Sequence, residues 1–484
     1  MPFFVFDLPV AVGVVAEAIA IVLALVVAPH GRRPSSALAW IVLIITVPAL
    51  GIILFGLIGS AKLPAARQER QREMNRLISH AAHEIAPVIA RYDSPGWLSS
   101  IAHLNEQVGA LPLVEGREAR LLSTFDDQLR ALIAAADGAR TTLHVEFYIL
   151  ALDDTTAPFF AALEDARARG VQVRVLLDHL GSAGYPGYRR ARKELDRLGV
   201  EWHLMLPIQP FRGRYTRPDL RNHRKLLVAD GDLAIVGSMN VIDPSYERRK
   251  NRRRGLRWRD LMVQVRGTVV AEVQVLFITD WYSETDELLD LAEPLPPNGG
   301  GDLLCQIAPS GPAFPAENNL ALFNSLIYAA ERRLSITSPY FVPDESLLGA
   351  LLTAARRGVA VELFVGAIGD QLFVFHAQHS YYQDLLDAGV RIYLYPAPNI
   401  LHAKHLTVDD LVGVIGSSNM DIRSFQLDLE LSLMVCSRAF TDDLRRIEDG
   451  YRAVSTELTE AEWSARSRLH RIGDDLARLT SAVQ

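Results

Sequence analysis

Two clusters of polar residues with identical spacing are the part of the sequence best suited to chemistry. Each has the order His-x-Lys-x4-Asp, then six residues, then Gly-Ser-x-Asn. The first cluster comprises His223, Lys225, Asp230, Ser238 and Asn240. The second comprises His402, Lys404, Asp409, Ser417 and Asn419. Residues two positions apart on a strand project from the same face, so we expect each His beside its Lys.

These residue types suit exchange at a phosphate group without a metal ion. Such exchange needs a nucleophile, a proton donor for the leaving alcohol, and cations around the phosphoryl oxygens. Two histidines can supply the first two, because an ordinary pKa of about 6.5 allows one neutral and one protonated ring near neutral pH. Lys225 and Lys404 would act as point charges beside the oxygens, helped by the Ser hydroxyls and Asn amides of both clusters. The sequence has no nucleotide-binding loop, so we expect no cofactor.

The segments around the clusters follow one another in the same order twice. A strand-like run at 143–150 corresponds to another at 334–342. In each copy two helices follow, and each ends in a glycine directly before an apolar strand, as a left-handed helix end requires. These glycines are Gly170, Gly199, Gly358 and Gly389. Because strands that alternate with helices pair in parallel, we expect an α/β fold with two tandem α/β sandwich modules in one pseudo-symmetric unit.

The expected domain limits follow from this repeat. The first module is placed at 121–293 and the second, with a C-terminal helix, at 294–484. The proline- and glycine-rich stretch 294–301 separates them, since such residues are typical of linkers. The charged, helix-rich residues 61–120 are expected to form a juxtamembrane connector.

Two apolar runs precede the connector. Residues 10–28 contain one charge, Glu17, and residues 37–59 contain none. Because about 20 helical residues cross the hydrocarbon core of a bilayer, we expect residues 1–60 to form a two-helix transmembrane hairpin. Basic residues are more numerous after the second run than in the turn between the runs, which predicts that the rest of the chain faces the cytoplasm.

The amino-acid composition argues for a membrane-embedded part and against two other classes of protein. The 484 residues are 49% hydrophobic and their mean hydropathy is +0.11, which favours a membrane-embedded part. There are 50 Lys and Arg residues against 57 Asp and Glu residues, and this balance argues against a general nucleic-acid binder. The two cysteines, Cys305 and Cys436, are too few for a disulfide framework and indicate a reducing compartment.

The duplicated clusters make this chain resemble the phospholipase D superfamily, whose hallmark is this pattern. The resemblance covers residues 120–455, and the runs RNHRKLLVADG, SPYFVPD and WRD also fit it. The apolar hairpin and basic connector make the chain similar to membrane-anchored bacterial cardiolipin synthases of this superfamily. The resemblance implies two phospholipase D-like modules behind the hairpin, at the bacterial inner membrane.

The same resemblance implies a transferase that joins two phosphatidylglycerol molecules into cardiolipin and releases glycerol. It implies that one histidine, taken as His223, attacks phosphorus and forms a phosphohistidine. His402 would protonate the leaving glycerol and later act as the base. The pseudo-symmetric sequence leaves these two roles open. A hydrolase or nuclease with the same site is one alternative, and a membrane scaffold with an inactive site is another.

Two further acidic residues are expected to support the histidines. Glu430 follows the second cluster within an apolar strand, where an unpaired carboxylate would be costly. Asp260 has the matching place in the first copy. The resemblance implies that each acid orients the histidine of its own copy. Asp230 and Asp409 lie at strand-to-turn junctions, and we expect them to hold the loop rather than take part in chemistry.

Two arginine-rich insertions occur only in the first copy, before His223 and before Asp260. They combine basic and aromatic side chains, which suits the headgroup region of a membrane. We therefore expect phosphatidylglycerol and anionic membrane lipids as partners, and no nucleic acid; a solvated charge run is the alternative. The residues expected to bind headgroups are Arg212, Arg214, Arg252, Arg253, Arg254 and Trp258.

His376 and His379 lie three residues apart on an expected helix and could imitate a metal-binding pair. No third ligand is apparent in the sequence, so we expect no metal site.

Overall fold

The structure is a computed structural model of the chain. It describes residues 21–22, 25–27, 34–59, 63–82, 94–109, 111–212, 214–290, 301–312, 314 and 317–479. The chain divides into two compact units, residues 1–62 with 217–219 and residues 63–216 with 220–484. The expected linker 294–301 lies almost wholly outside the described residues, so the boundary between the modules stays a prediction.

The described part of the first unit contains two short helices, α2 (Pro34–Thr46) and α3 (Pro48–Ile58). They lie against each other, since the rings of Trp40 and Phe55 meet edge to face with their centroids 5.3 Å apart. Pro48 occupies the first turn of α3 and has no N–H to continue α2, which explains the break after Thr46. The second expected span, residues 37–59, in which Pro48 is expected to cause a kink, is therefore divided into two helices at that proline.

The lengths of these helices bear on the expected membrane hairpin. With 13 residues in α2 and 11 in α3, each is shorter than a bilayer core requires. Across the residues that the structure describes, no helix is both long and apolar enough to span a membrane. The other expected span, 10–28, lies mostly outside those residues.

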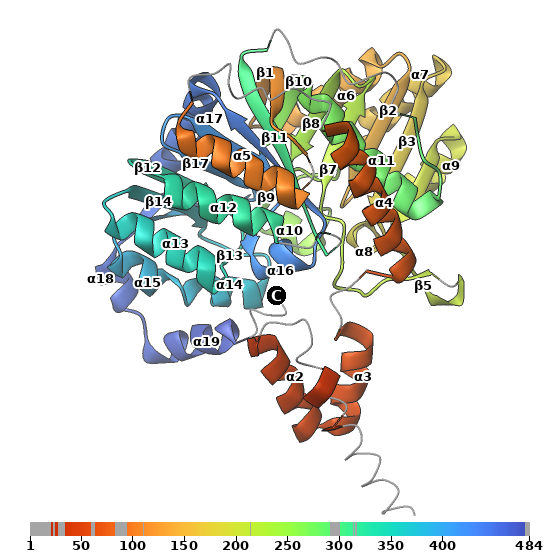
Figure 1. Cartoon of the computed structure of the whole chain (residues 1–484). Helices are drawn as coiled ribbons and strands as arrows, with labels where there is room; N and C mark the ends of the chain where they lie inside the picture. Colours follow the sequence, from red (N-terminus) through yellow and green to blue (C-terminus); the bar gives the residue numbers. More distant parts are fainter. Residues whose placement is uncertain are drawn as a thin grey trace, which may run out of the picture. The chain divides into compact units, whose positions relative to one another are not determined.

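A mixed sheet forms the centre of the second unit (Figure 1). Its described strands follow the order β21-β15-β14-β12-β17-β18-β20-β11-β1-β10-β8-β7-β2-β3-β4. The first half supplies β1 (Val114–Leu122), β2 (Thr142–Phe147), β3 (Gln172–Asp178), β4 (Glu201–Met205), β7 (Lys225–Ala229), β8 (Leu233–Gly237) and β10 (Met262–Gly267). The second half supplies β11 (Leu303–Ser310), β12 (Arg333–Thr337), β14 (Ala360–Gly366), β15 (Arg391–Tyr395), β17 (His405–Val408), β18 (Val412–Gly416), β20 (Glu430–Cys436) and β21 (Thr456–Leu458).

The strand pairing repeats from one half to the other. Strands β2, β3 and β4 are parallel, as are β12, β14 and β15. The remaining strands of each half pair antiparallel, which differs from the expected all-parallel arrangement, because tight turns join β7 to β8 and β17 to β18. Strands β1 and β11 pair antiparallel at the centre and join the halves. This order of strands confirms the duplicated α/β architecture.

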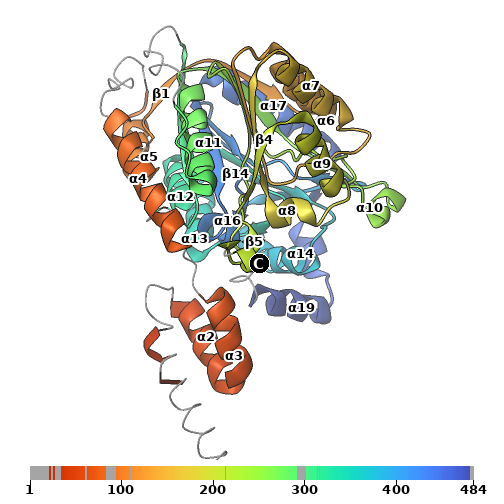
Figure 2. The same ribbon diagram turned by 90° about the vertical axis from the view of Figure 1, so that its right-hand side faces the viewer.

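Helices cover both faces of the sheet (Figure 2). The first half contributes α6 (Phe125–Gly138), α7 (Ala157–Ala168), α9 (Tyr188–Leu198) and α11 (Val269–Thr285). The second contributes α12 (Asn318–Ala329), α13 (Glu345–Arg356), α15 (Tyr382–Asp387) and α17 (Arg438–Val454). The four glycines expected to end helices all have positive φ, from 61° at Gly199 to 93° at Gly358, which confirms that prediction.

Two further helices, α4 (Ala65–Ala82) and α5 (Gly96–Gly109), precede β1 in the same unit. Arg70 of α4 donates a hydrogen bond of 2.8 Å to the carbonyl of Ser283 on α11. Asn105 of α5 donates one of 3.0 Å to Gln306 on β11. The segment expected as a connector is therefore packed on both halves of the sheet.

Candidate active site

Both motif histidines lie in the segment that leads into a strand of the sheet, His223 before β7 and His402 before β17. Their backbones are held by the opposite half of the molecule. The N–H of His223 donates to the carbonyl of Leu429 at 2.8 Å, and the N–H of His402 donates to the carbonyl of Arg259 at 2.7 Å. Each backbone contact is made to the residue just before an acid of the other half, Glu430 for His223 and Asp260 for His402.

The side chains follow the same crossed arrangement. Nδ1 of His223 lies 3.0 Å from Oε1 of Glu430, and Nδ1 of His402 lies 2.7 Å from Oδ1 of Asp260. The expectation that each acid orients the histidine of its own copy is therefore wrong. The reason is the strand register, which brings Leu429 beside Asn222 and thus Glu430 to the first histidine. An ionised acid in either pair accepts a hydrogen bond from Nδ1–H, which leaves Nε2 for chemistry.

The two motif serines hold the acids. The hydroxyl of Ser238 donates to Asp260 at 2.7 Å, and that of Ser417 donates to Glu430 at 2.5 Å. Each hydroxyl also accepts the N–H of the residue after its acid, at 3.0 Å in both halves. Both serines are buried behind the histidines. They orient the carboxylates and do not line the pocket, which corrects the prediction that they contact phosphate oxygens.

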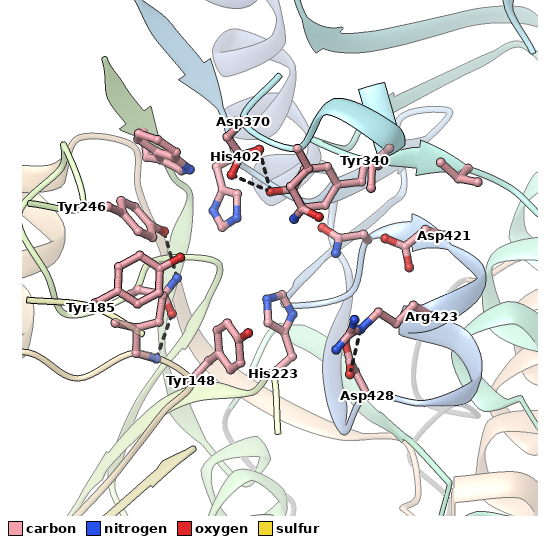
Figure 3. A pocket seen from close by; sticks show the side chains of 17 residues that line it. Tyr148, Tyr185, His223, Tyr246, Tyr340, Asp370, His402, Asp421, Arg423 and Asp428 are labelled. Carbon is pink, nitrogen blue, oxygen red and sulfur yellow. Dashed lines mark hydrogen bonds and ion pairs between the residues drawn. The ribbon is translucent and has the colours of Figure 1, made fainter. Parts of the chain in front are cut away.

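The histidine rings face each other across a pocket of about 240 Å³ (Figure 3). Asn240 and Asn419 of the two clusters also line it. Four tyrosines form much of the remaining wall: Tyr148, Tyr185, Tyr246 and Tyr340. The pocket is smaller than those that enclose a drug-sized ligand, so it suits a polar headgroup rather than acyl chains.

The motif lysines lie behind the histidines. Nζ of Lys225 donates to the carbonyl of His223 at 2.6 Å, and Nζ of Lys404 donates to that of His402 at 2.8 Å. Neither lysine is among the residues that line the pocket, but Nζ of Lys225 lies 5.1 Å from the ring centroid of Tyr148, which does line it. Burial lowers the pKa of Lys225 to about 7 and that of Lys404 to about 8, although the two acids oppose the shift.

The two histidines differ in their electrostatic surroundings. Burial and both lysines lower the pKa of His223 well below its ordinary value. Burial and Lys404 also lower the pKa of His402, but Asp260 counteracts this shift. The pKa of both rings is therefore lowered, and at His402 the contact with Asp260 opposes that shift.

The pKa values of the two acids that contact the histidines, Glu430 and Asp260, are shifted in opposite directions. Burial raises the pKa of Glu430 to about 7, although Lys225 opposes it. Burial would also raise the pKa of Asp260, but the contacts with His402 and Lys404 bring it below the ordinary value. At neutral pH Asp260 is thus ionised, whereas Glu430 is near its midpoint. The pairs share a geometry but not a charge state.

The motif aspartates stand apart from the pocket. Asp230 and Asp409 follow the far ends of β7 and β17, with positive φ values of 52° and 49°. Asp230 accepts the N–H groups of three residues that lead into β2, at 2.7 to 3.0 Å. Asp409 does the same before β12. They hold loops, as their position at the turn suggests, and they do not belong to the reacting group.

Buried polar contacts fix the segment before β7. Asn222 donates its side-chain amide to Glu146 at 2.9 Å and its backbone N–H to Asp178 at 2.9 Å. Arg224 donates to the carbonyl of Glu430 at 3.0 Å. Arg221, which belongs to the first arginine-rich insertion, is buried and pairs with Asp178 at 3.3 Å. This arginine is therefore a structural residue and not part of a basic surface.

Several pocket residues were missed by the sequence interpretation. Tyr340 donates to Asp370 at 2.9 Å beside His402, and Arg423 donates to Asp428 at 3.2 Å on the opposite wall (Figure 3). The available signal was three charged residues, Asp421, Arg423 and Asp428, in the short segment between the second cluster and Glu430. Asp370 had no comparable signal, because it lies in a loop far from both motifs.

The residues expected to bind headgroups have different surroundings. Trp258 is only 5% exposed and lines the pocket against Tyr246, so its placement on an outer surface is corrected. Arg214 pairs with Glu284 at 3.0 Å, and Arg252 pairs with Glu247. Arg252 is nevertheless exposed, as are Arg212, Arg253 and Arg254. The last two lie at the end of a short helix, α10 (Arg249–Arg253).

A third possible metal ligand, an acidic residue, does lie beside the histidine pair of α14 (Leu372–His379). Nδ1 of His376 lies 2.8 Å from Asp474 of α19 (Arg468–Arg478), and Nδ1 of His379 lies 4.0 Å from it. The expectation that a third ligand type is missing is therefore wrong. Arg466 also pairs with Asp474, however, and this guanidinium competes with any cation for the carboxylate.

Comparisons with known proteins agree with this geometry. The chain matches the family model described as "Cardiolipin synthase, PLD-like domain" over residues 132–281 and 323–449. Cardiolipin synthase A of Pectobacterium carotovorum is 32% identical over 453 residues, and that of Serratia proteamaculans is 33% identical over 462 residues. Each alignment covers 92% of this chain and 92% of the relative. A solved phosphatidylserine synthase from Haemophilus influenzae superposes with a TM-score of 0.59 at 15% identity, which shows the shared fold. It covers 79% of this chain and 100% of that one.

Proposed function

Because this chain belongs to the phospholipase D-like family of cardiolipin synthases, we propose that it joins two phosphatidylglycerol molecules into cardiolipin and releases glycerol. The enzyme is a phosphatidyltransferase of the cardiolipin synthase type, with phospholipids as substrates. The observation that carries the detailed proposal is the pair of facing histidines, each held by an acid of the other half.

In the first step, Nε2 of His223 attacks the phosphorus of one phosphatidylglycerol. The bond between phosphorus and the glycerol oxygen breaks, and His402 gives its proton to that oxygen. The difference between the two environments supports this assignment, because the nucleophile must be neutral and the acid protonated. Burial and both lysines lower the pKa of His223, which favours its neutral form, and the charge of Asp260 favours a proton on His402.

In the second step, His402 takes the proton from a glycerol hydroxyl of another phosphatidylglycerol. The resulting oxygen attacks phosphorus, the bond to Nε2 of His223 breaks, and cardiolipin leaves. No water is consumed. In the intermediate the P–N bond to His223 replaces one of the two ester bonds, and the attack of the second alcohol restores the diester in cardiolipin. Lys225 and Lys404 stabilise the extra negative charge from behind the rings, where the low local dielectric strengthens their field.

The two alternatives predict different products. A hydrolase or nuclease would use water in the second step, and a scaffold would need no intact reactive pair. The presence of both histidine–acid pairs favours an enzyme over a scaffold. Purified protein incubated with phosphatidylglycerol should yield cardiolipin and glycerol in equal amounts. Phosphatidic acid would indicate a hydrolase, and unchanged lipid would indicate a scaffold.

Membrane attachment through the N-terminal unit completes the proposal. Apolar side chains on α2 and α3 are exposed, among them Leu38, Val42, Ile45 and Ile53. Side chains of this kind are stable in lipid. Together with residues 10–28 they would anchor the chain in the bacterial inner membrane, with the active site on the cytoplasmic side. Alkaline extraction of membranes should leave the full chain in the pellet, and release of the protein would contradict anchoring.

Headgroup capture by the exposed arginines is a further part of the proposal. Arg212, Arg253 and Arg254 would attract anionic lipids, since a basic residue near an anionic membrane surface contributes about 1 kcal/mol.

The domain limits 121–293 and 294–484 are also retained as a proposal. The strand order, which repeats on either side of β1 and β11, supports the division into two modules, and β1 begins before residue 121.

A further inference from the structure

Helix α19 carries a row of exposed apolar side chains. Leu469, Ile472, Leu476 and Leu479 follow a spacing of three and four residues, which places them on one side of the helix. All four are exposed, and Leu469 and Leu479 reach 81% and 79%. Isolated exposed leucines are common, but an aligned row on one helix marks a surface that binds an apolar partner.

The opposite side of α19 is fixed to α14. Asp474 is buried between the helices and pairs with His376 and Arg466. Ala477, one turn later, is buried on the same side. The two helices lie side by side in both views (Figures 1 and 2). This attachment directs the apolar row away from α14 and holds α19 in a defined orientation.

Helix α14 in turn begins at the pocket that contains the two histidines. Asp370, Gln371 and Val374 line the pocket, whereas Leu372 and Phe373 between them are each 68% exposed. One short segment thus presents polar groups to the reaction site and apolar groups to the outside. The apolar side chains of α14 and α19 together form what we call the α14–α19 face: Leu372, Phe373, Leu469, Ile472, Leu476 and Leu479.

Basic side chains accompany the apolar row. Arg468, Arg471 and Arg478 are exposed on α19, against one exposed acid on that helix, Asp475. An apolar stripe flanked by arginines is typical of helices that lie in the surface of an anionic bilayer. A soluble partner protein would not explain why this face adjoins the pocket mouth, but a bilayer that contains the substrate does.

We propose that the α14–α19 face docks on an anionic phospholipid surface and holds the mouth of the pocket against it. The inference rests on the proposed function, because only a lipid substrate has to pass from a bilayer into this pocket. Docking through this face is separate from anchoring by α2 and α3, since it orients the catalytic unit rather than tethering it.

A local fluorescent probe tests the docking directly. Cys305 and Cys436 are buried, so a cysteine introduced as Ile472→Cys in the full chain can be labelled selectively with an environment-sensitive fluorophore. The test uses vesicles of phosphatidylglycerol and phosphatidylcholine, with nitroxide-bearing lipids as quenchers. We expect a blue shift and strong quenching for Ile472→Cys. The control Val454→Cys, on an exposed apolar position of α17, should show neither change.

A kinetic test uses the double variant Leu469→Ser, Leu476→Ser, with Leu288→Ser, Val454→Ser as the matched control. The apparent KM for vesicle phosphatidylglycerol should rise about tenfold or more, because two large side chains no longer enter the bilayer. The kcat at saturating lipid should not change. A short-chain phosphatidylglycerol dissolved as monomers should be used equally well by all variants.

The outcomes separate the two proposals. A label that stays in water while the enzyme makes cardiolipin overturns the docking alone, as does an unchanged KM. A label that enters the bilayer in a protein that makes no cardiolipin supports the docking and refutes the proposed function.

Discussion

Replacing Asp260 with Asn should remove the charge that keeps a proton on His402. The carboxylate oxygen lies 2.7 Å from Nδ1 of His402, and both side chains are buried. An opposite charge within about 4–6 Å shifts a pKa by about 1–3 units, and one unit corresponds to about 1.4 kcal/mol. Asn has nearly the same shape as Asp, so the loss of charge is the main change. We expect the pKa of His402 to fall by at least about one unit.

The sign of the effect on activity follows from the proton that His402 must donate. Donation requires a pH below the pKa of His402, and Asp260 raises that pKa. Asp260→Asn should therefore move the alkaline limb of the profile of kcat/KM against pH to lower pH. Above the pKa, each unit lost reduces the protonated fraction about tenfold, so activity at neutral pH should fall about tenfold to a thousandfold. Part of it should return on acidification.

Two measurements check this prediction. Glycerol release from phosphatidylglycerol gives the pH profile, and nitrogen NMR of labelled histidines gives the titration of each ring. Glu430→Gln is the matched control, because Glu430 contacts His223 and should leave the titration of His402 in place. If Asp260→Asn shifted the titration of His223 and not that of His402, the crossed pairing would be refuted.

Four further predictions concern other parts of the enzyme. Alanine in place of either pocket histidine should remove nearly all turnover, and labelled substrate should trap a phosphohistidine that is stable in base and lost in acid; label on serine would contradict the mechanism. Exhaustive chelation should leave activity intact, because buried lysines supply the positive charge; an absolute need for a divalent ion would refute this assignment. Replacing Arg252, Arg253 and Arg254 together with Gln should raise the apparent KM in mixed membranes without lowering kcat, and added salt should imitate the change; a collapsed kcat at constant KM would show a role in bond making. Asp230→Ala should lower the free energy of unfolding by about 1–3 kcal/mol, through lost hydrogen bonds to the loop before β2, with little effect on kcat; a loss of kcat without a loss of stability in denaturant unfolding would contradict its structural role.

Local patterns made much of the catalytic unit predictable. The spacing of each motif and the helix-ending glycines are short-range signals, and they identified both histidines and the repeated α/β order. Spacing did not predict that the ammonium of each motif lysine bonds to the backbone carbonyl of its histidine. That detail depends on the exact residue at which a strand begins, which spacing alone does not determine.

Long-range register explains the larger differences. Whether Glu430 meets the near or the far histidine depends on how β20 is placed relative to the segment before β7, more than 200 positions earlier in the chain. The pocket residues Asp370, which lies in a loop, and Trp258, which lies in a short strand (Arg257–Arg259), are brought together only by the fold. In the first unit, by contrast, a single local feature decides the outcome, because Pro48 divides an uninterrupted apolar run into two helices.

The crossed pairing has a consequence for how the two halves of this chain can evolve. A fragment with one half alone would carry a histidine without its acid and an acid without its histidine. An unfused ancestor built on this plan could work only as a pair of copies that exchange these groups. After fusion, drift in one half is constrained by a residue encoded in the other. Complementary substitutions should therefore arise between the halves, in the surroundings of the two crossed pairs, His223 with Glu430 and His402 with Asp260.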